Sequence, residues 1–199
     1  MELNDAIEKL KKYIAGIYDS TGRKIGTNIF RGHLRSISSD VEDGIALFIA
    51  DILSVNYSIF LDSSININGS NNRPDLLLVD GDNTVRAMIE IKANMGWCRN
   101  ASAVIDDIKS NDIKFRTEKQ LTCKFSREEE KNIIYGDNVI LFLIAFSDSN
   151  CNGKNHKANK LYASNHNVFQ FNLFSGWYES LINCEIEDFG NEIISGLRI

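Results

Sequence analysis

Apolar residues recur along the chain with two different spacings, and each spacing predicts a different kind of element. Near the N-terminus, apolar residues return every three or four positions, which is typical of one face of an amphipathic helix. This stripe consists of Leu3, Ile7, Leu10, Ile14 and Ile17. We expect it to pack on its own domain, because two heptads are short for a coiled coil.

Further helices are predicted by start signals and by mixed apolar and polar spacing. The stretch SSDVEDGIALFIADIL carries Ser39 and, three residues later, Glu42, a pairing that forms a capping box where helices begin. Two more helices are predicted, at residues 101–115 and 190–199, and residues 116–131 are expected to be partly helical. Polar composition predicts that residues 19–36 and 151–160 are irregular.

Short apolar runs without helical spacing predict strands, because strands buried on both faces read as continuous apolar stretches. These runs are YSIFLDSSININ, DLLLVD, TVRAMIEIKA, NVILFLIAF and NVFQFNLF. DLLLVD and TVRAMIEIKA are joined by a short polar turn and are predicted to pair as a hairpin. Leu76 and Leu78 would share one face of it with Ile89 and Ile91, and Leu77 and Val79 would share the other with Met88. The order of elements therefore predicts an α/β domain with a mixed central sheet flanked by helices.

Three charged residues interrupt the apolar strands of this hairpin: Asp75, Glu90 and Lys92. If Asp82 and Asn83 form a two-residue turn, Asp75 lies directly opposite Glu90, and Lys92 points to the same face. Opposed Cβ atoms are about 5 Å apart, and two carboxylates there repel by about 3 kcal/mol at an effective dielectric constant of about 20. A divalent cation would reverse the sign of this energy, because carboxylate oxygens are its ligands. A loop one residue longer or shorter would place the acids on opposite faces.

Pro74–Asp75 followed by Glu90–Ile91–Lys92 on the next strand resembles the PD-(D/E)XK nuclease superfamily, which has the restriction-endonuclease-like fold. The stretch around Glu42 resembles the first core helix of that family, which often supplies a further acid. The resemblance covers about residues 39–146 and implies a core of order α-β-β-β-α-β. It thus implies a single nuclease-like domain over residues 1–199, with N-terminal helical and C-terminal additions.

The chemistry implied by the resemblance is Mg²⁺-dependent hydrolysis of phosphodiester bonds, with Mn²⁺ as a substitute metal. Asp75 and Glu90 would hold the metal together with the backbone carbonyl of Ile91, and the metal would polarise the phosphate and activate a water. Lys92 would position that water and offset the charge that develops on the phosphate. Glu42 would touch the site directly or through water, although a capping-box role explains this residue equally well.

We expect duplex DNA as the substrate, in restriction, defence or repair, although the resemblance itself does not carry over DNA rather than RNA. An RNA nuclease and a non-catalytic module that binds nucleic acid or protein remain alternatives on the same fold. The basic residues that we expect to contact phosphates are Arg31, Arg35, Lys109, Lys114, Arg116, Lys154 and Lys157. A homodimer is expected as well, because cutting both strands in one event needs two sites related by symmetry.

Composition and charge restrict the functions and the compartment that the sequence allows. The chain has 199 residues and a formal net charge of −5, which argues against a wholly basic surface and still permits a local basic groove. Its four cysteines are scattered and form no CxxC pair, so we expect reduced thiols in a cytoplasmic protein. The sequence shows neither a signal-peptide pattern nor an apolar run long enough to cross a bilayer, so no membrane association is expected.

Overall fold

The computed structural model describes residues 1–21, 24–26, 29–30, 38–53, 56–67, 69–94, 101–124, 129–147, 153–176 and 181–197. Its helices are α1 (Leu3–Thr21), α2 (Ser38–Ile52), α3 (Ser102–Glu118), α4 (Gly153–Asn165) and α5 (Ile186–Gly196). Its first strands are β1 (Lys24–Gly26), β2 (Ile29–Phe30), β3 (Ser58–Leu61), β4 (Ser64–Ile67), β5 (Ser70–Asn72) and β6 (Leu76–Val79). The later strands are β7 (Thr84–Asn94), β8 (Gln120–Lys124), β9 (Glu130–Ser147), β10 (Phe169–Ser175) and β11 (Ile182–Asn183).

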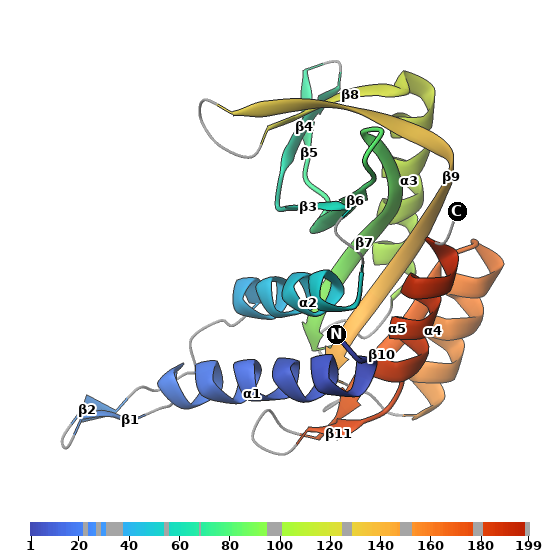
Figure 1. Ribbon diagram of the computed structural model, residues 1–199. Coiled ribbons are helices and arrows are strands. Elements are labelled where there is room, and N and C mark those ends of the chain that lie inside the picture. Colours follow the sequence, from blue (N-terminus) through green and yellow to red (C-terminus); the bar gives the residue numbers. More distant parts are fainter. Residues whose placement is uncertain are drawn as a thin grey trace.

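A mixed β-sheet runs through the molecule (Figure 1). Its strands pair in the order β3-β6-β7-β9-β8-β4-β5, and β10 pairs with both β9 and β11. The pairs β3–β6 and β6–β7 are antiparallel, whereas β7–β9 and β9–β10 are parallel. The long β9 curves so that its first part pairs with β8 and its last part with β10 (Figure 1). The predicted α/β class with a mixed central sheet is therefore confirmed.

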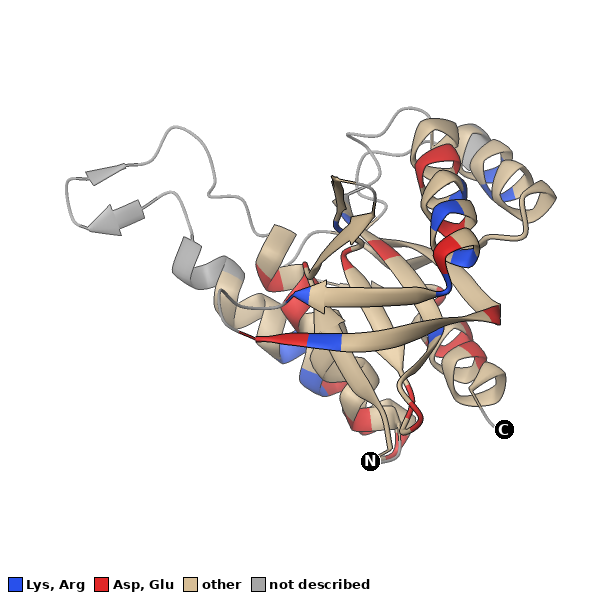
Figure 2. Cartoon of the chain, turned by 90° about the horizontal axis from the view of Figure 1, so that it is seen from above, with Lys and Arg blue, Asp and Glu red and all other residues tan. Residues whose placement is uncertain are grey.

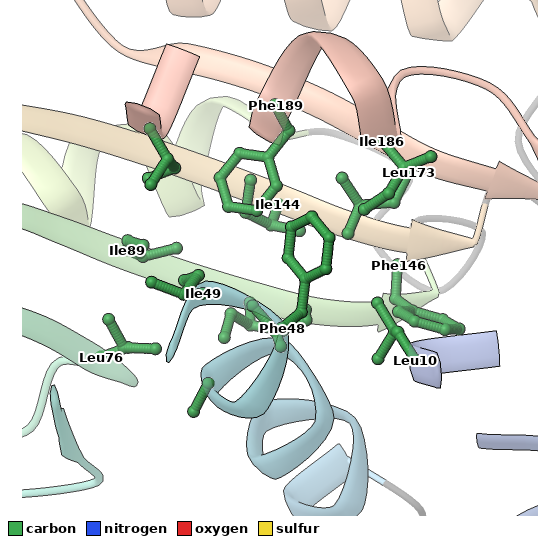
Figure 3. Close-up of a cluster of buried hydrophobic side chains, with 14 of the residues drawn as sticks. Leu10, Phe48, Ile49, Leu76, Ile89, Ile144, Phe146, Leu173, Ile186 and Phe189 are labelled. Atoms are coloured by element: carbon green, nitrogen blue, oxygen red, sulfur yellow. The ribbon is translucent and has the colours of Figure 1, made fainter. Parts of the chain in front are cut away.

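Helices cover both faces of this sheet and form two apolar clusters. The first cluster joins α1, α2 and α5 to the sheet (Figure 3) and includes Leu10, Phe48, Ile89, Ile144 and Phe189. The second cluster joins α3 to the opposite face and includes Leu77, Met88, Ile105, Phe115 and Leu143. Burying one side chain of this size stabilises the folded protein by about 1.5–3 kcal/mol. The helices on both faces of the sheet therefore contribute to the stability of the fold.

The two faces of the β6–β7 hairpin are divided between these clusters as its sequence predicts. Leu76, Leu78, Ile89 and Ile91 belong to the first cluster, and Leu77, Val79 and Met88 belong to the second. The stripe of α1 also packs on its own domain, since Ile7, Leu10 and Ile14 are buried against α2 in the first cluster. No helix within the described ranges combines the length and apolar character needed to cross a membrane.

Several predicted elements differ from the structure. The stretch 57–68 is not one strand, because the chain turns at Asp62, whose φ of 41° ends β3 before β4 begins. Within the stretch 151–160, which was predicted to be irregular, residues 153–160 belong to helix α4, and after α3 ends at Glu118 the chain forms strand β8. Helix α4 has almost no apolar stripe, so packing against its neighbours overrides its weak sequence signal. Thr21 still belongs to α1, and short strands β1 and β2 follow within the stretch predicted to be irregular.

Candidate active site

The turn between β6 and β7 is one residue longer than the sequence predicts. Asp80 donates its N–H to the carbonyl of Thr84 at 2.9 Å, so Gly81, Asp82 and Asn83 form a three-residue loop. Asn83 has a φ of 60°, the left-handed conformation that three-residue hairpin loops use at their last position. The predicted two-residue turn is therefore wrong.

A β-bulge compensates for the longer loop. Val79 pairs with Val85, but Leu78 pairs with Ala87, so Arg86 is an extra residue in β7. Asp80 stabilises both irregularities: its Oδ1 accepts the N–H groups of Asp82 and Thr84, and its Oδ2 accepts Arg86 Nε at 2.6 Å.

Beyond the bulge, the register brings the two predicted acids together. Leu76 pairs with Ile89, so the next position along each strand places Asp75 opposite Glu90. The N–H of Ile91 donates to Asp75 Oδ2 at 2.6 Å, which fixes the direction of this carboxylate. The predicted opposition of the acids is present, although a different turn produces it.

The surroundings of Asp75 disfavour its negative charge. Burial is the largest cause, followed by the charge of Glu90, and together they raise the pKa of Asp75 from an ordinary 3.8 to about 7. The Ile91 N–H and the Lys92 ammonium act in the opposite direction, because both favour the carboxylate. Burial and the neighbouring Glu90 charge therefore outweigh the two groups that favour the Asp75 carboxylate.

Lys92 is the cation of this group. Its Nζ lies 2.6 Å from Glu90 Oε1, and both side chains are about three-quarters buried, with 29% and 25% of their surface exposed. The acid–x–lysine spacing places the two residues on one face of β7, which makes this contact possible. The structure thus brings the predicted Asp75, Glu90 and Lys92 into one electrostatic unit.

Glu42 approaches the same unit from helix α2. Burial and then the charge of Asp62 raise the pKa of Glu42, while Lys92 lowers it and Glu90 raises it. Helix α2 already begins at Ser38, so Ser39 lies inside the helix and the predicted capping box is not formed. Glu42 is half-buried, and its carboxylate interacts with the residues of the hairpin.

Asp62 is a member of this group that the sequence pattern does not reveal. It follows β3, and its N–H donates to the carbonyl of Asp75 at 2.9 Å. Its charge is the second cause of the raised pKa of Glu42. Its position between two apolar runs reads only as a turn residue, so spacing alone gives no signal that it joins the site.

The chemistry of these side chains fits a hard divalent cation, because Asp75, Glu90, Glu42 and Asp62 all offer carboxylate oxygens. In the described part of the chain, no three Asp, Glu, His or Cys side chains are already arranged to hold an ion. Glu90 and Asp75 instead accept hydrogen bonds from Lys92 and Ile91. A cation that uses Glu90 Oε1 would therefore have to displace Lys92 from this oxygen.

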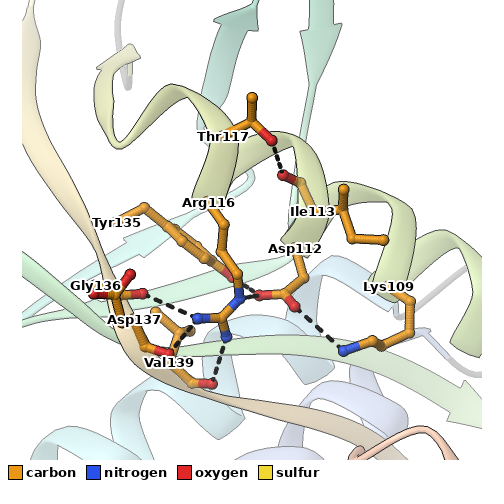
Figure 4. A network of polar contacts seen from close by, with 9 residues as sticks. All are labelled: Lys109, Asp112, Ile113, Arg116, Thr117, Tyr135, Gly136, Asp137 and Val139. Atoms are coloured by element: carbon orange, nitrogen blue, oxygen red, sulfur yellow. Dashed lines mark hydrogen bonds and ion pairs between the residues drawn. The ribbon is translucent and has the colours of Figure 1, made fainter.

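Three of the basic residues predicted to contact phosphates lie on helix α3 and already have polar partners within the chain. Lys109 and Arg116 are held by Asp112 of the same helix, at 3.3 and 2.8 Å, and Tyr135 donates to this carboxylate at 3.0 Å (Figure 4). Lys114 donates to Asn72 at 3.4 Å. Along α3, acidic and basic residues are interspersed rather than gathered (Figure 2).

The remaining predicted phosphate contacts are only partly described. Lys157 is exposed on helix α4. Arg31 and Arg35 lie outside the described residues, as does the side chain of Lys154. The network around Asp112 joins α3 to the curved part of β9, because Arg116 also donates to the carbonyls of Gly136, Asp137 and Val139 (Figure 4).

No family model, curated protein or solved structure matches this chain.

Proposed function

We propose that this protein is a metal-dependent nuclease of the PD-(D/E)XK type that hydrolyses phosphodiester bonds of DNA. The observation that carries the proposal is the opposition of Asp75 and Glu90 across the β6–β7 hairpin, with Lys92 on Glu90. Folding alone gives no reason to place two carboxylates and an ammonium on an apolar hairpin in the interior of the sheet, since each charge costs free energy when it leaves water.

The order of elements around this group supports the proposal. Helix α2 is followed by β3, β6 and β7, then by α3 and by β9, which is parallel to β7. Apart from the inserted β4–β5 hairpin and strand β8, this is the order α-β-β-β-α-β expected of a restriction-endonuclease-like core. Asp75 directly precedes β6 and Glu90 lies on β7, the second and third strands of that order.

The residues would divide the reaction between them. Asp75 and Glu90, with the backbone carbonyl of Ile91, would hold Mg²⁺ or Mn²⁺, which when bound supplies charge stabilisation and an acidic water. The Ile91 N–H orients the Asp75 carboxylate. Lys92 Nζ would leave Glu90 to hold the attacking water and the charged phosphate oxygen. Glu42 and Asp62 would add negative charge that draws the cation in.

The test is incubation of the purified protein with plasmid, linear duplex, single-stranded DNA and RNA, each with Mg²⁺, Mn²⁺, Ca²⁺ or EDTA. We expect cleavage of DNA with Mg²⁺ or Mn²⁺ and none with EDTA. Cleavage of RNA alone would reassign the substrate. Binding to nucleic acid without cleavage under any of these conditions would favour a non-catalytic module and would overturn the proposal.

A further inference from the structure

Arg73 lies directly before Pro74–Asp75 and differs from the other arginines whose side chains the structure describes. Arg86 and Arg116 each form an ion pair with an aspartate, at 2.6 and 2.8 Å. Arg73 is exposed and, among the described residues, has neither an ion pair nor a hydrogen bond. The stability of the fold therefore does not explain why a guanidinium stands beside the candidate active site.

The backbone at Arg73 is held on both sides. Asn72 is only 8% exposed, and its Nδ2 donates to the carbonyls of Ile65 and Ser70 at 3.5 and 3.2 Å. Pro74 is buried, and a proline restricts the residue before it to extended conformations. An exposed side chain between two buried neighbours projects from a fixed backbone, which lowers the entropy lost when it binds a ligand.

A second cation lies next to Arg73. Lys114 of helix α3 is exposed, and its Nζ lies 3.4 Å from Oδ1 of Asn72. An amide is neutral, so this contact leaves the charge of Lys114 in place, and no carboxylate among the described residues pairs with it. In a chain of formal net charge −5, two neighbouring cations without a carboxylate partner indicate an anion from outside the chain.

The position of Arg73 relative to Asp75 fits a nucleic-acid strand. Two residues of extended chain span at most about 7 Å, and a DNA strand carries one phosphate per about 3.4 Å of helix axis. The charges that act most on the pKa of Asp75 are those of Glu90, Lys92 and Glu42. Arg73 therefore does not neutralise the acids, although it stands close enough to meet a phosphate of a strand that passes them.

We propose that Arg73, together with Lys114, binds a phosphate that neighbours the cleaved one on the DNA strand. The proposal rests on the nuclease function, because the cleavage site determines which part of the strand passes Arg73. The planar guanidinium of arginine donates two hydrogen bonds to one phosphate, and the ammonium of Lys114 adds a point charge. Arg73 is thus a substrate-binding residue that places the strand and takes no part in the bond-breaking step.

The salt dependence of DNA binding tests this contact without turnover. The binding constant of a labelled duplex is measured in EDTA by fluorescence anisotropy, at salt concentrations between about 50 and 200 mM. Each phosphate contact contributes about 0.9 to the slope of log K against log salt concentration. Arg73→Gln should weaken binding and reduce this slope by about 0.9, whereas Arg73→Lys should keep most of it because the charge remains. Lys114→Gln should reduce the slope as well, and the double variant should reduce it more than either single variant.

Lys12→Gln is the matched control, because Lys12 is exposed on α1 and its substitution removes the same charge. Thermal melting checks that each variant folds. An unchanged slope in Arg73→Gln, an equal decrease in Lys12→Gln, or a wild type that does not bind duplex would overturn the inference. Inorganic phosphate that displaces the duplex at equal phosphate concentration would overturn the assignment to a nucleic-acid strand.

Cleavage with Mg²⁺ is assayed separately. Arg73→Gln should raise KM with little change in kcat, because the contact is made before and during the reaction alike. Cleavage by a wild type whose salt slope does not depend on Arg73 refutes only this inference. Binding with a slope that depends on Arg73, but without cleavage under any condition, refutes the proposed function and leaves the phosphate contact standing.

Discussion

Neighbouring groups act in opposite directions on the protonation of the Asp75 carboxyl group. The Ile91 N–H and Lys92 favour its negative charge, while burial and Glu90 oppose it more strongly. The result is a carboxyl group that binds a proton near neutral pH in the metal-free protein. Protons and cations therefore compete for the same oxygens, and metal affinity should rise with pH across this range.

The pH dependence of stability follows from the same shift. The folded pKa of Asp75, about 7, lies above its ordinary value of 3.8, so between these pH values the folded state binds the proton that the unfolded state has lost. Unfolding free energy should therefore fall as pH rises from about 4 to about 7. Asp75→Asn should remove this slope, as urea unfolding in EDTA at several pH values would show. A slope that persists unchanged in the variant would mean that other groups cause it.

Lys92→Ala tests catalysis separately from folding. The variant should lose cleavage by at least about 100-fold, the usual contribution of a positioned acid–base group. Because the pair with Glu90 is about three-quarters buried, the melting temperature should fall as well, so cleavage is compared at a temperature at which both proteins are folded. Cleavage at the wild-type rate would show that Lys92 is not catalytic. Lys12→Ala, at an exposed lysine on α1 that is not among the predicted phosphate contacts, is the control.

The residues of the site were predictable to different degrees. Asp75, Glu90 and Lys92 interrupt apolar strands, and charge in such a setting is a visible signal. Asp62 carries no such signal, because its place beside Asp75 depends on a turn with positive φ and on one backbone hydrogen bond.

At the scale of elements, the β6–β7 hairpin reached the predicted register by an unpredicted route. The longer loop alone would have moved Asp75 to the face opposite Glu90, and the bulge at Arg86 moves it back. Local propensity does not reveal a bulge without glycine, because Arg86 is an ordinary strand residue. The sequence pattern did not predict helix α4 for a related reason, because tertiary packing and not its own apolar spacing stabilises this helix.

Asp80 should be a main determinant of this hairpin. Asp80→Ala removes the acceptor of the Asp82 and Thr84 N–H groups and the partner of Arg86. We expect the free energy of unfolding to fall by about 1–3 kcal/mol, measured by urea denaturation. The exposed Asp82 gives the matched control, since Asp82→Ala should change it by less than about 0.5 kcal/mol. Equal effects of the two substitutions would contradict this role of Asp80.

For the whole molecule, cation binding should appear as added stability. Ca²⁺, Mg²⁺ or Mn²⁺ should raise the melting temperature of wild type, and a cation at a hundred times its dissociation constant should add about 2.7 kcal/mol. Asp75→Asn should lose most of this rise while melting higher than wild type in EDTA, because one of two repelling charges is gone. Calorimetric titration of both proteins measures the binding itself. A wild type that binds none of these cations, even with nucleic acid present, would remove the basis of the metal site.

The number of active sites in the assembly determines whether the product is a nick or a double-strand break. We expect a homodimer in solution or on duplex DNA, because one site cuts one strand and a double-strand break in one event needs two. Light scattering with and without duplex measures the mass of the assembly, and plasmid cleavage distinguishes linear from nicked product. A monomer that yields only nicks would contradict the dimer and point to a nicking or repair enzyme.

The place of the opposed acids within a local hairpin bears on how the chain folds. β6 and β7 follow one another in sequence, whereas the parallel pairing of β7 with β9 must wait for the chain to pass through α3 and β8. Local pairings form early because they close short loops at little entropic cost. Repulsion between Asp75 and Glu90 therefore acts before the sheet is complete. The proposed active site should then slow folding as well as lower the stability of the folded protein.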